Sequence, residues 1–154
     1  MNEFFLKFEI QDEDSFNRLS AAFDGFKSDK TEKTQRSGED WLEHFSDSEL
    51  KTFWWPTEQE KEEWMNRWQS TPVPQRFTDP SLVTPWDFES MIEAIYSGEY
   101  SLEKIEVRND GYGYLVFEPF SFPYGGSDSL KALIEAYSHK VIMIEDGNEN
   151  EAEQ

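Results

Sequence analysis

The stretch LEKIEVRNDGYGYLVFEP, residues 102–119, contains the clearest structural signal in this chain. Ile105 and Val107 alternate with charged residues and lead into an Asn-Asp-Gly turn at 109–111, and an apolar run follows at 112–117. Asn, Asp and Gly tolerate the positive φ angles that a tight hairpin turn requires. The stretch therefore predicts two antiparallel strands joined by a short turn, which make a sheet the centre of the fold.

Two further strands and two helices surround this hairpin. Residues 3–10 (EFFLKFEI) alternate apolar and charged side chains, which indicates a strand with one buried face, whereas residues 139–146 (HKVIMIED) predict a final strand that is apolar on both faces. Residues 11–26 and 127–137 carry apolar side chains at helical spacing. We expect an α+β fold with an antiparallel or mixed sheet of about four strands and helices on one face, in the β-α-β-β-α-β order of a ferredoxin-like core.

The chain is expected to form a single α+β domain over residues 1–146. Residues 27–38 contain no apolar side chain and four basic ones, which predicts a mobile basic loop. Residues 39–97 are predicted to be a Trp-rich helical insertion, with capping boxes at 46–49 (SDSE) and 57–60 (TEQE) and an apolar helical stripe at 88–96. The acidic segment 147–154 is expected to be a disordered tail.

The composition restricts the kind of partner. The chain has 33 acidic against 14 basic residues and a net charge of −19, which repels nucleic acid and anionic membranes. It has no cysteine, and its N-terminal residues resemble neither a signal peptide nor a membrane span. An aromatic content of 16% argues against disorder. We expect a cytoplasmic protein that binds neither nucleic acid nor membrane.

No residue pattern indicates catalysis, a cofactor or a metal site. Both histidines lie outside recognisable catalytic motifs, and the acidic stretches lack the alternating ligands of a calcium loop. The GGSDS segment at 125–129 lacks the lysine spacing of a phosphate loop, and Asp128 would compete with an anion there. Glu118 lies between Phe117 and Pro119, so it is the acid whose setting most favours burial, and Glu135 is second.

The tryptophans provide the strongest hint of a binding surface. All six lie between positions 41 and 86, which is more than a small helical layer needs for its core. We expect most of them in the core and one or two rings exposed, since tryptophan often dominates protein interfaces. The predicted contact residues combine tryptophans with acids of the predicted 57–69 helix. They are Trp54, Trp55, Glu58, Glu62, Glu63 and Trp68.

These features favour a non-enzymatic protein that binds a basic protein partner, because acidic charge accelerates encounter and exposed rings supply contact area. A bacterial immunity protein that neutralises a basic toxin would have this profile. One alternative is a small enzyme or ligand-binding protein with a pocket lined by Tyr112, Tyr114, Glu118 and Tyr124. Another is a homo-oligomeric structural subunit. The sequence is therefore compatible with either a monomer or a homodimer.

Overall fold

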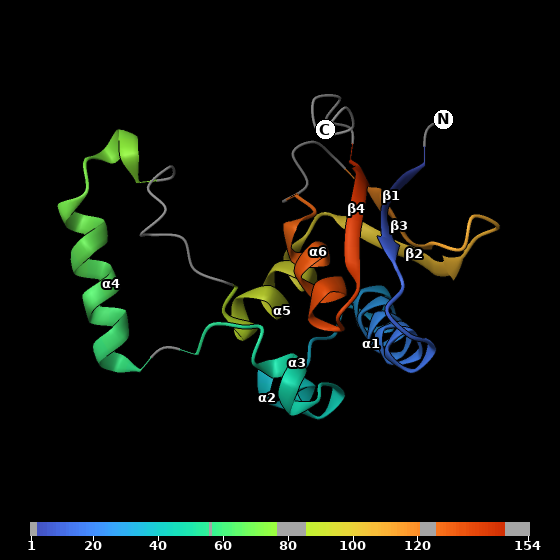
Figure 1. Cartoon of the computed structure of the whole chain (residues 1–154), viewed down its shortest axis with the longest axis horizontal. Helices are drawn as coiled ribbons and strands as arrows, with labels where there is room; N and C mark the ends of the chain where they lie inside the picture. Colours follow the sequence, from blue (N-terminus) through green and yellow to red (C-terminus); the bar gives the residue numbers. More distant parts are fainter. Residues whose placement is uncertain (1–2, 56, 77–85, 121–125, 147–154) are drawn as a thin grey trace.

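The computed structural model describes residues 3–55, 57–76, 86–120 and 126–146, and within them the protein is α+β. Four antiparallel strands form one sheet in the order β2-β3-β1-β4 (Figure 1). The strands are β1 (Phe4–Glu9), β2 (Tyr100–Val107), β3 (Gly113–Pro119) and β4 (Lys140–Glu145). The α-helices are α1 (Glu13–Glu32), α2 (Gly38–Trp41), α3 (Asp47–Leu50), α4 (Glu58–Ser70), α5 (Phe88–Ser97) and α6 (Asp128–Ala136), with short 3-10 helices at Leu42–His44 and Val73–Gln75.

The predicted hairpin is confirmed as β2 and β3. Its register pairs Val107 with Gly113 and Leu102 with Phe117, with one irregularity between Leu102 and Lys104. Gly111 adopts a φ of +83° in the turn, a conformation that costs glycine little. The local turn chemistry therefore sets this register, as the sequence predicts.

One face of the sheet packs against helices. Apolar side chains of β1 and β3 alternate toward this face, and α1 contacts β2 while α6 contacts β1 and β4. The buried side chains that meet there are Leu6, Phe8, Leu19, Phe23, Phe26, Leu115, Phe117, Leu130, Leu133 and Ile134. Helix α5 packs on α6 and also touches α1, so it extends this helical layer.

Gly113 allows β1 and β3 to pack around Phe8. The two residues are register partners, and a Cβ atom on Gly113 would lie 2.4 Å from the Phe8 ring. Real Cβ atoms do not approach a ring that closely. Any side chain at position 113 would thus displace a ring at the centre of the core.

The prediction of a loop over 27–38 is wrong for its first half, because α1 continues through Glu32. Polar contacts replace the missing apolar stripe. The buried carboxylate of Asp29 accepts hydrogen bonds from Arg36 Nε at 2.9 Å and from the Tyr96 hydroxyl. The Lys30 ammonium donates to carbonyl oxygens at the end of α5. These partners lie outside α1, so they tie its last turns to the rest of the protein.

Two polar networks attach the helical middle to the body. Trp41 stacks on Phe26 at 4.0 Å, and its indole N–H donates to the Tyr96 hydroxyl at 2.9 Å. Arg18 of α1 forms a bidentate ion pair with Glu49, a buried residue that also closes the capping box of α3 with Ser46. Both predicted capping boxes, at 46–49 and 57–60, are confirmed.

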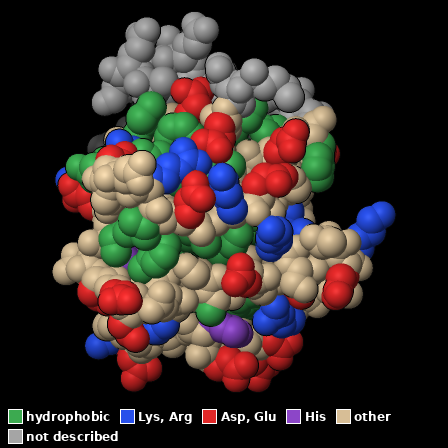
Figure 2. All heavy atoms as spheres, turned by 90° about the vertical axis from the view of Figure 1, so that its right-hand side faces the viewer, with side chains coloured by type: hydrophobic (Ala, Val, Ile, Leu, Met, Phe, Trp, Pro, Cys, Tyr) green, Lys and Arg blue, Asp and Glu red, His purple; other side chains and the backbone are tan. Residues whose placement is uncertain are grey.

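The opposite face of the sheet is not packed against a helix of the described residues. Tyr114 and Val116 are nevertheless buried. The Arg108 guanidinium lies over the Tyr114 ring at 4.2 Å and helps to cover it. Figure 2 shows acidic, basic and hydrophobic side chains interspersed on one side of the molecule, without one continuous acidic patch. Strand β4 exposes Ile142 and Met143, which agrees with its apolar character on both faces.

Candidate functional site

The chain leaves the body and returns to it at one point. The backbone N–H of Trp54 donates to the carbonyl oxygen of Trp86 at 2.9 Å, and Trp54 pairs with Asp87 in a parallel bridge. Asp87 in turn caps α5, because its side chain accepts from the backbone N–H of Ser90. The described residues between these points, 55 and 57–76, form what we call the arm. Figure 1 shows its helix, α4, standing apart from the sheet and the other helices.

Helix α4 is stabilised mainly by its own ends. Thr57 Oγ1 accepts from the Glu60 N–H at 3.1 Å, and the Glu60 carboxylate accepts from the Thr57 N–H at 3.1 Å. None of the residues from Glu58 to Ser70 is buried. Most helices in proteins depend on packing of an apolar face, and an isolated helix of this length is marginal in water. The arm is thus an exposed element held by caps and by a few aromatic contacts.

Three tryptophans form a line along the arm and its base. The Trp64 and Trp68 rings stack with centroids 5.3 Å apart, and Trp54 lies 6.2 Å from Trp64. The Arg76 guanidinium lies over Trp68 at 5.4 Å, and its Nε donates to the Thr71 carbonyl oxygen. These rings are half-buried, so they connect the arm to its base while each keeps part of its surface in solvent.

Three of the four acidic residues of α4, Glu58, Glu62 and Glu63, lie on other faces of the helix than the stacked tryptophans. Glu58, Glu62 and Met65 share a face, since residues three and four apart in an α-helix are neighbours. Glu63 directly follows Glu62 in the helix, so its side chain points to a different side from that of Glu58, Glu62 and Met65. Met65 is 45% exposed, between these carboxylates. The outer face of α4 therefore combines negative charge with exposed apolar surface.

The predicted contact residues all lie on the arm or at its base, but not on one face. Trp55 is 50% exposed; its ring stacks on Phe88, and its indole N–H donates to the Leu50 carbonyl oxygen. Among the six tryptophans, Trp41 alone is buried, and Trp55 and Trp86 are exposed. Two exposed rings match the prediction, but the expectation that most of the others fill the core is wrong. Trp54, Trp64 and Trp68 instead form the half-buried aromatic line along the arm and its base.

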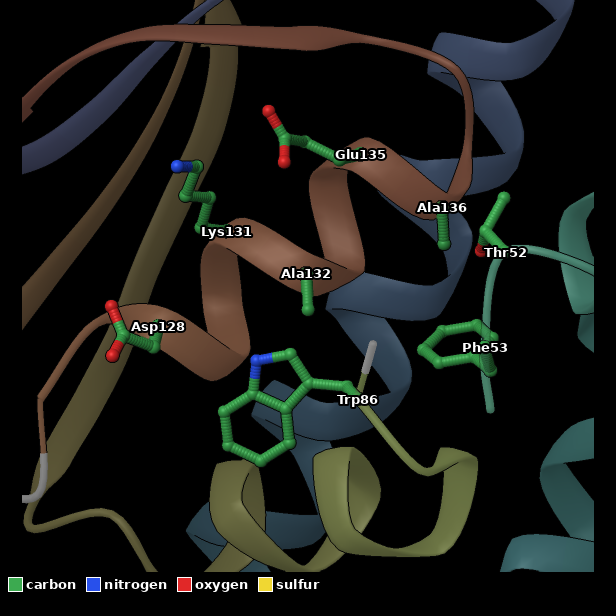
Figure 3. A pocket seen from close by; sticks show the side chains of 8 residues that line it. All are labelled: Thr52, Phe53, Trp86, Asp128, Lys131, Ala132, Glu135 and Ala136. Atoms are coloured by element: carbon green, nitrogen blue, oxygen red, sulfur yellow. The ribbon is translucent and has the colours of Figure 1, made fainter. Parts of the chain in front are cut away.

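A groove of about 440 Å³ lies beside the base of the arm (Figure 3). On one side, the rings of Trp86 and Phe53 point toward α6. On the other side, α6 presents Ala132 between charged residues at the rim. The charged residues on the rim are Asp128, Lys131 and Glu135. The groove thus has an apolar floor and a rim with two carboxylates and one ammonium group.

Sequence reasoning did not identify this groove. Helical spacing could have shown that Asp128, Ala132 and Glu135 share a flank of α6. It could not have shown that Phe53 and Trp86 lie opposite that flank. Their position depends on the bridge at Trp54, which joins two segments far apart in the sequence.

The residues of the alternative pocket are only partly together. Tyr112 and Tyr114 lie near the hairpin turn. There the Tyr114 hydroxyl donates to the Asp110 carboxylate, and Lys7 Nζ lies 3.2 Å from the same carboxylate. The hydrogen bond from Tyr114, with those from the Tyr112 N–H and Lys7, lowers the pKa of Asp110 to about 2. This cluster covers the open face of the sheet.

Glu118 and Glu135 are both exposed, so the prediction that they are the best candidates for burial is wrong. Glu118 follows the last inward-facing residue of β3, and its side chain turns away from the core. Glu135 lies on the rim of the groove. Tyr124 lies outside the described residues. Among the described residues the buried acids are Glu49 and Asp29, and the capping-box pattern identifies Glu49 as a structural residue.

One buried ionisable group belongs to neither surface. His139 is 3% exposed; its Nδ1 accepts from the Gln11 N–H at 2.9 Å, and its Nε2 has no hydrogen-bond partner among the described residues. Burial lowers the pKa of His139 below its ordinary value, despite the nearby carboxylates of Asp12 and Glu49. The imidazole is therefore neutral and contributes to packing between Phe8 and Phe16.

The described residues show neither a metal-binding cluster nor a membrane-spanning helix. Among them, no three acidic or histidine side chains gather in a way that would hold a metal ion. None of the helices in those ranges has both the length and the apolar character needed to cross a bilayer.

The arm and the groove at its base are therefore the most distinctive surface features of the fold. Comparison of the chain with protein-family models, with curated proteins and with solved structures found no match.

Proposed function

We propose that this protein is a non-enzymatic binding protein whose arm and adjoining groove engage a basic macromolecular partner. The observation that carries the proposal is that α4 stands apart from the body with no buried residue. A role as a bacterial immunity protein, which blocks a basic toxin in the cytoplasm, fits this chemistry.

The energetics favour a partner on the arm. Exposed apolar side chains such as Met65 and Trp55 leave surface in contact with water that a partner could bury. Glutamates around them attract cationic side chains and speed encounter. Within α4, four glutamates face one lysine and one arginine. Aromatic anchors surrounded by charge are the usual composition of an energetic centre in a protein interface.

The groove would accept the end of such a partner. Its apolar floor of Phe53 and Trp86 suits an alkyl or aromatic side chain, and the carboxylates of Asp128 and Glu135 suit a cationic one. A lysine or arginine side chain combines an apolar stem with a cationic head. The groove and the arm meet at the backbone hydrogen bond between Trp54 and Trp86, so one partner can contact both.

We also propose a ferredoxin-like core for the sheet with α1 and α6, and a Trp-rich helical insertion over residues 39–97. The order β2-β3-β1-β4 with antiparallel neighbours supports the core, because two interleaved β-α-β units produce this arrangement. Such a core occurs with many functions and by itself implies none.

The alternative functions have less support. Glu118 is exposed, and the three cavities described for this protein are not lined by Tyr112, Tyr114 or Glu118. A homo-oligomeric subunit would bring together two chains that each carry −19. Light scattering at two salt concentrations separates a monomer from a dimer.

The proposal is tested by capture on the immobilised protein from an extract of the source organism, at low and at high salt. We expect a basic protein to be retained at low salt and largely released at high salt, because salt screens exposed charge pairs. Mass spectrometry identifies the retained protein. Retention of no basic protein, or retention that is indifferent to salt, would contradict the proposal.

A further inference from the structure

A second cavity, of about 400 Å³, lies at the opposite end of α1 from the capped N-terminus. The last turns of α1, the end of α5 and the start of β2 enclose it. We call it the lysine pocket, defined by Lys27, Lys30, Lys33, Tyr96, Leu102 and Phe120. Its volume lies within the range of small-molecule sites.

Two of the lysines are fixed by backbone carbonyl groups. Lys27 Nζ donates to the Glu103 carbonyl oxygen at 2.7 Å. Lys30 Nζ donates to Ile95 and Gly98 carbonyl oxygens at 2.7 and 2.9 Å and lies 4.6 Å from the centre of the Tyr100 ring. Because these contacts use neutral oxygens, they hold the ammonium groups without cancelling their charge.

The pocket is positively charged in an acidic protein. Among the described residues that line the pocket, Asp29 supplies the one carboxylate, and it is already paired with Arg36 Nε at 2.9 Å. Glu103 lies nearby, and its carboxylate accepts from the hydroxyl of Ser101. The protein carries a net charge of −19, but salt at 0.1 M screens exposed charges that lie more than about 10 Å from the pocket. An anion in the pocket would thus respond mainly to Lys27, Lys30 and Lys33.

The pocket also offers apolar surface. Phe120 is 71% exposed at its rim, and Leu102 and the Tyr100 ring lie beneath. A Cβ atom on Gly98 would lie 2.2 Å from the Tyr100 ring, so a glycine at this position lets the ring sit against the backbone. Phe120 is placed by its backbone N–H, which donates to the Glu99 carbonyl oxygen at 2.8 Å.

We propose that the lysine pocket binds a small organic anion, a phosphate ester or carboxylate that carries an aromatic or alkyl group. The anionic head group would lie among the ammonium groups, and the apolar part would lie against Phe120. The same lining disfavours two other classes of ligand. A cation meets three lysines, and an uncharged apolar molecule gains nothing from them. The site is separate from the arm and does not depend on the function proposed for it.

The test is a titration followed by the amide signals of the labelled protein, at constant ionic strength. The probes are phenyl phosphate, inorganic phosphate and benzyl alcohol, at millimolar concentrations. We expect phenyl phosphate to shift the signals of Thr31, Thr34, Gly98 and Ser101 saturably. It should bind about tenfold more tightly than either other probe, because each of those lacks one half of the recognised group.

Variants separate this site from general attraction of anions. Lys27 and Lys33 are exposed, so Lys27→Gln and Lys33→Gln should leave the fold intact. Together they should weaken phenyl phosphate binding about tenfold or more, whereas the charge-matched pair Lys51→Gln and Lys140→Gln should leave it unchanged. Equal binding by the two double variants would overturn the proposal. Absence of saturable shifts at the pocket, or shifts only at other surfaces, would also overturn it.

Discussion

The backbone N–H of Trp54 is hydrogen-bonded to the carbonyl oxygen of Trp86, and this contact closes the base of the arm. Everything described between them projects from the body or lies along its surface. The fold therefore separates into a body, whose core is continuous through the sheet and the helices packed on it, and an arm that contributes little to that core.

Breaking α4 should leave the body folded. Met65→Pro places proline inside α4, where it removes a hydrogen bond and costs about 3 kcal/mol of helix stability. Since no residue of α4 is buried, we expect helical circular dichroism to fall while the melting temperature changes by only about 2 °C. The matched control is Glu93→Pro at an exposed position of α5, which packs on α6 and should lower the melting temperature strongly. Equal destabilisation by both variants would show that the arm belongs to the core.

The ion pair between Arg18 and Glu49 should be a main attachment of α3. Arg18→Met leaves the Glu49 carboxylate buried without its partner, which should cost about 3 kcal/mol of unfolding free energy. Arg18→Met with Glu49→Gln should recover part of this loss, because no buried charge remains and glutamine can still close the capping box. Urea unfolding of the two single variants and the double variant measures the coupling. A double variant as unstable as the sum of the single variants would contradict the pairing.

The sequence predicts the parts of the fold that depend on neighbouring residues, but not those that depend on distant segments meeting. The hairpin, the capping boxes and the α5 stripe follow from residues within one turn or one strand pair, so local patterns identify them. The end of α1 was missed because Asp29 and Lys30 are stabilised by Arg36, Tyr96 and the α5 carbonyl groups, which no helical pattern reveals. The groove was missed for the same reason, since it depends on two distant segments meeting at the bridge.

His139 should make the protein less stable as the pH falls below about 6.5, the ordinary histidine value. Its pKa is lowered in the folded state, so between these two values the unfolded chain binds a proton that the folded chain does not. The stabilisation by neutral His139 is thus fully present above the unfolded pKa and is lost as the pH falls toward the folded one. His139→Asn, which keeps an acceptor for the Gln11 N–H, should flatten this part of the profile. The measurement is the unfolding free energy of the unmodified protein and of the variant from pH 7.5 to 5. An equal dependence of this free energy on pH in the two proteins would refute the role of His139.

Lys30 should titrate well below an ordinary lysine. Burial lowers its pKa to about 8, although its ammonium group donates to three carbonyl oxygens. The Cε and Hε chemical shifts of the labelled protein, assigned with Lys30→Arg, should show a midpoint near this value. A midpoint near the ordinary value of about 10.4 would mean that the site is more hydrated than its geometry indicates.

The central claim, that the arm binds a basic partner, is tested most directly with two charge-matched triple variants. One variant carries Glu58→Gln, Glu62→Gln and Glu63→Gln on the arm. The control carries Glu9→Gln, Glu32→Gln and Glu43→Gln at exposed positions on the body, so both proteins lose the same negative charge.

The measurement is the dissociation constant of each variant for the basic protein that the unmodified chain captures, at low salt. We predict that the arm variant binds about tenfold or more weakly and that the control stays within about threefold of the unmodified chain. An equal loss in both variants would show that only the total charge matters, and it would contradict a specific role for the arm.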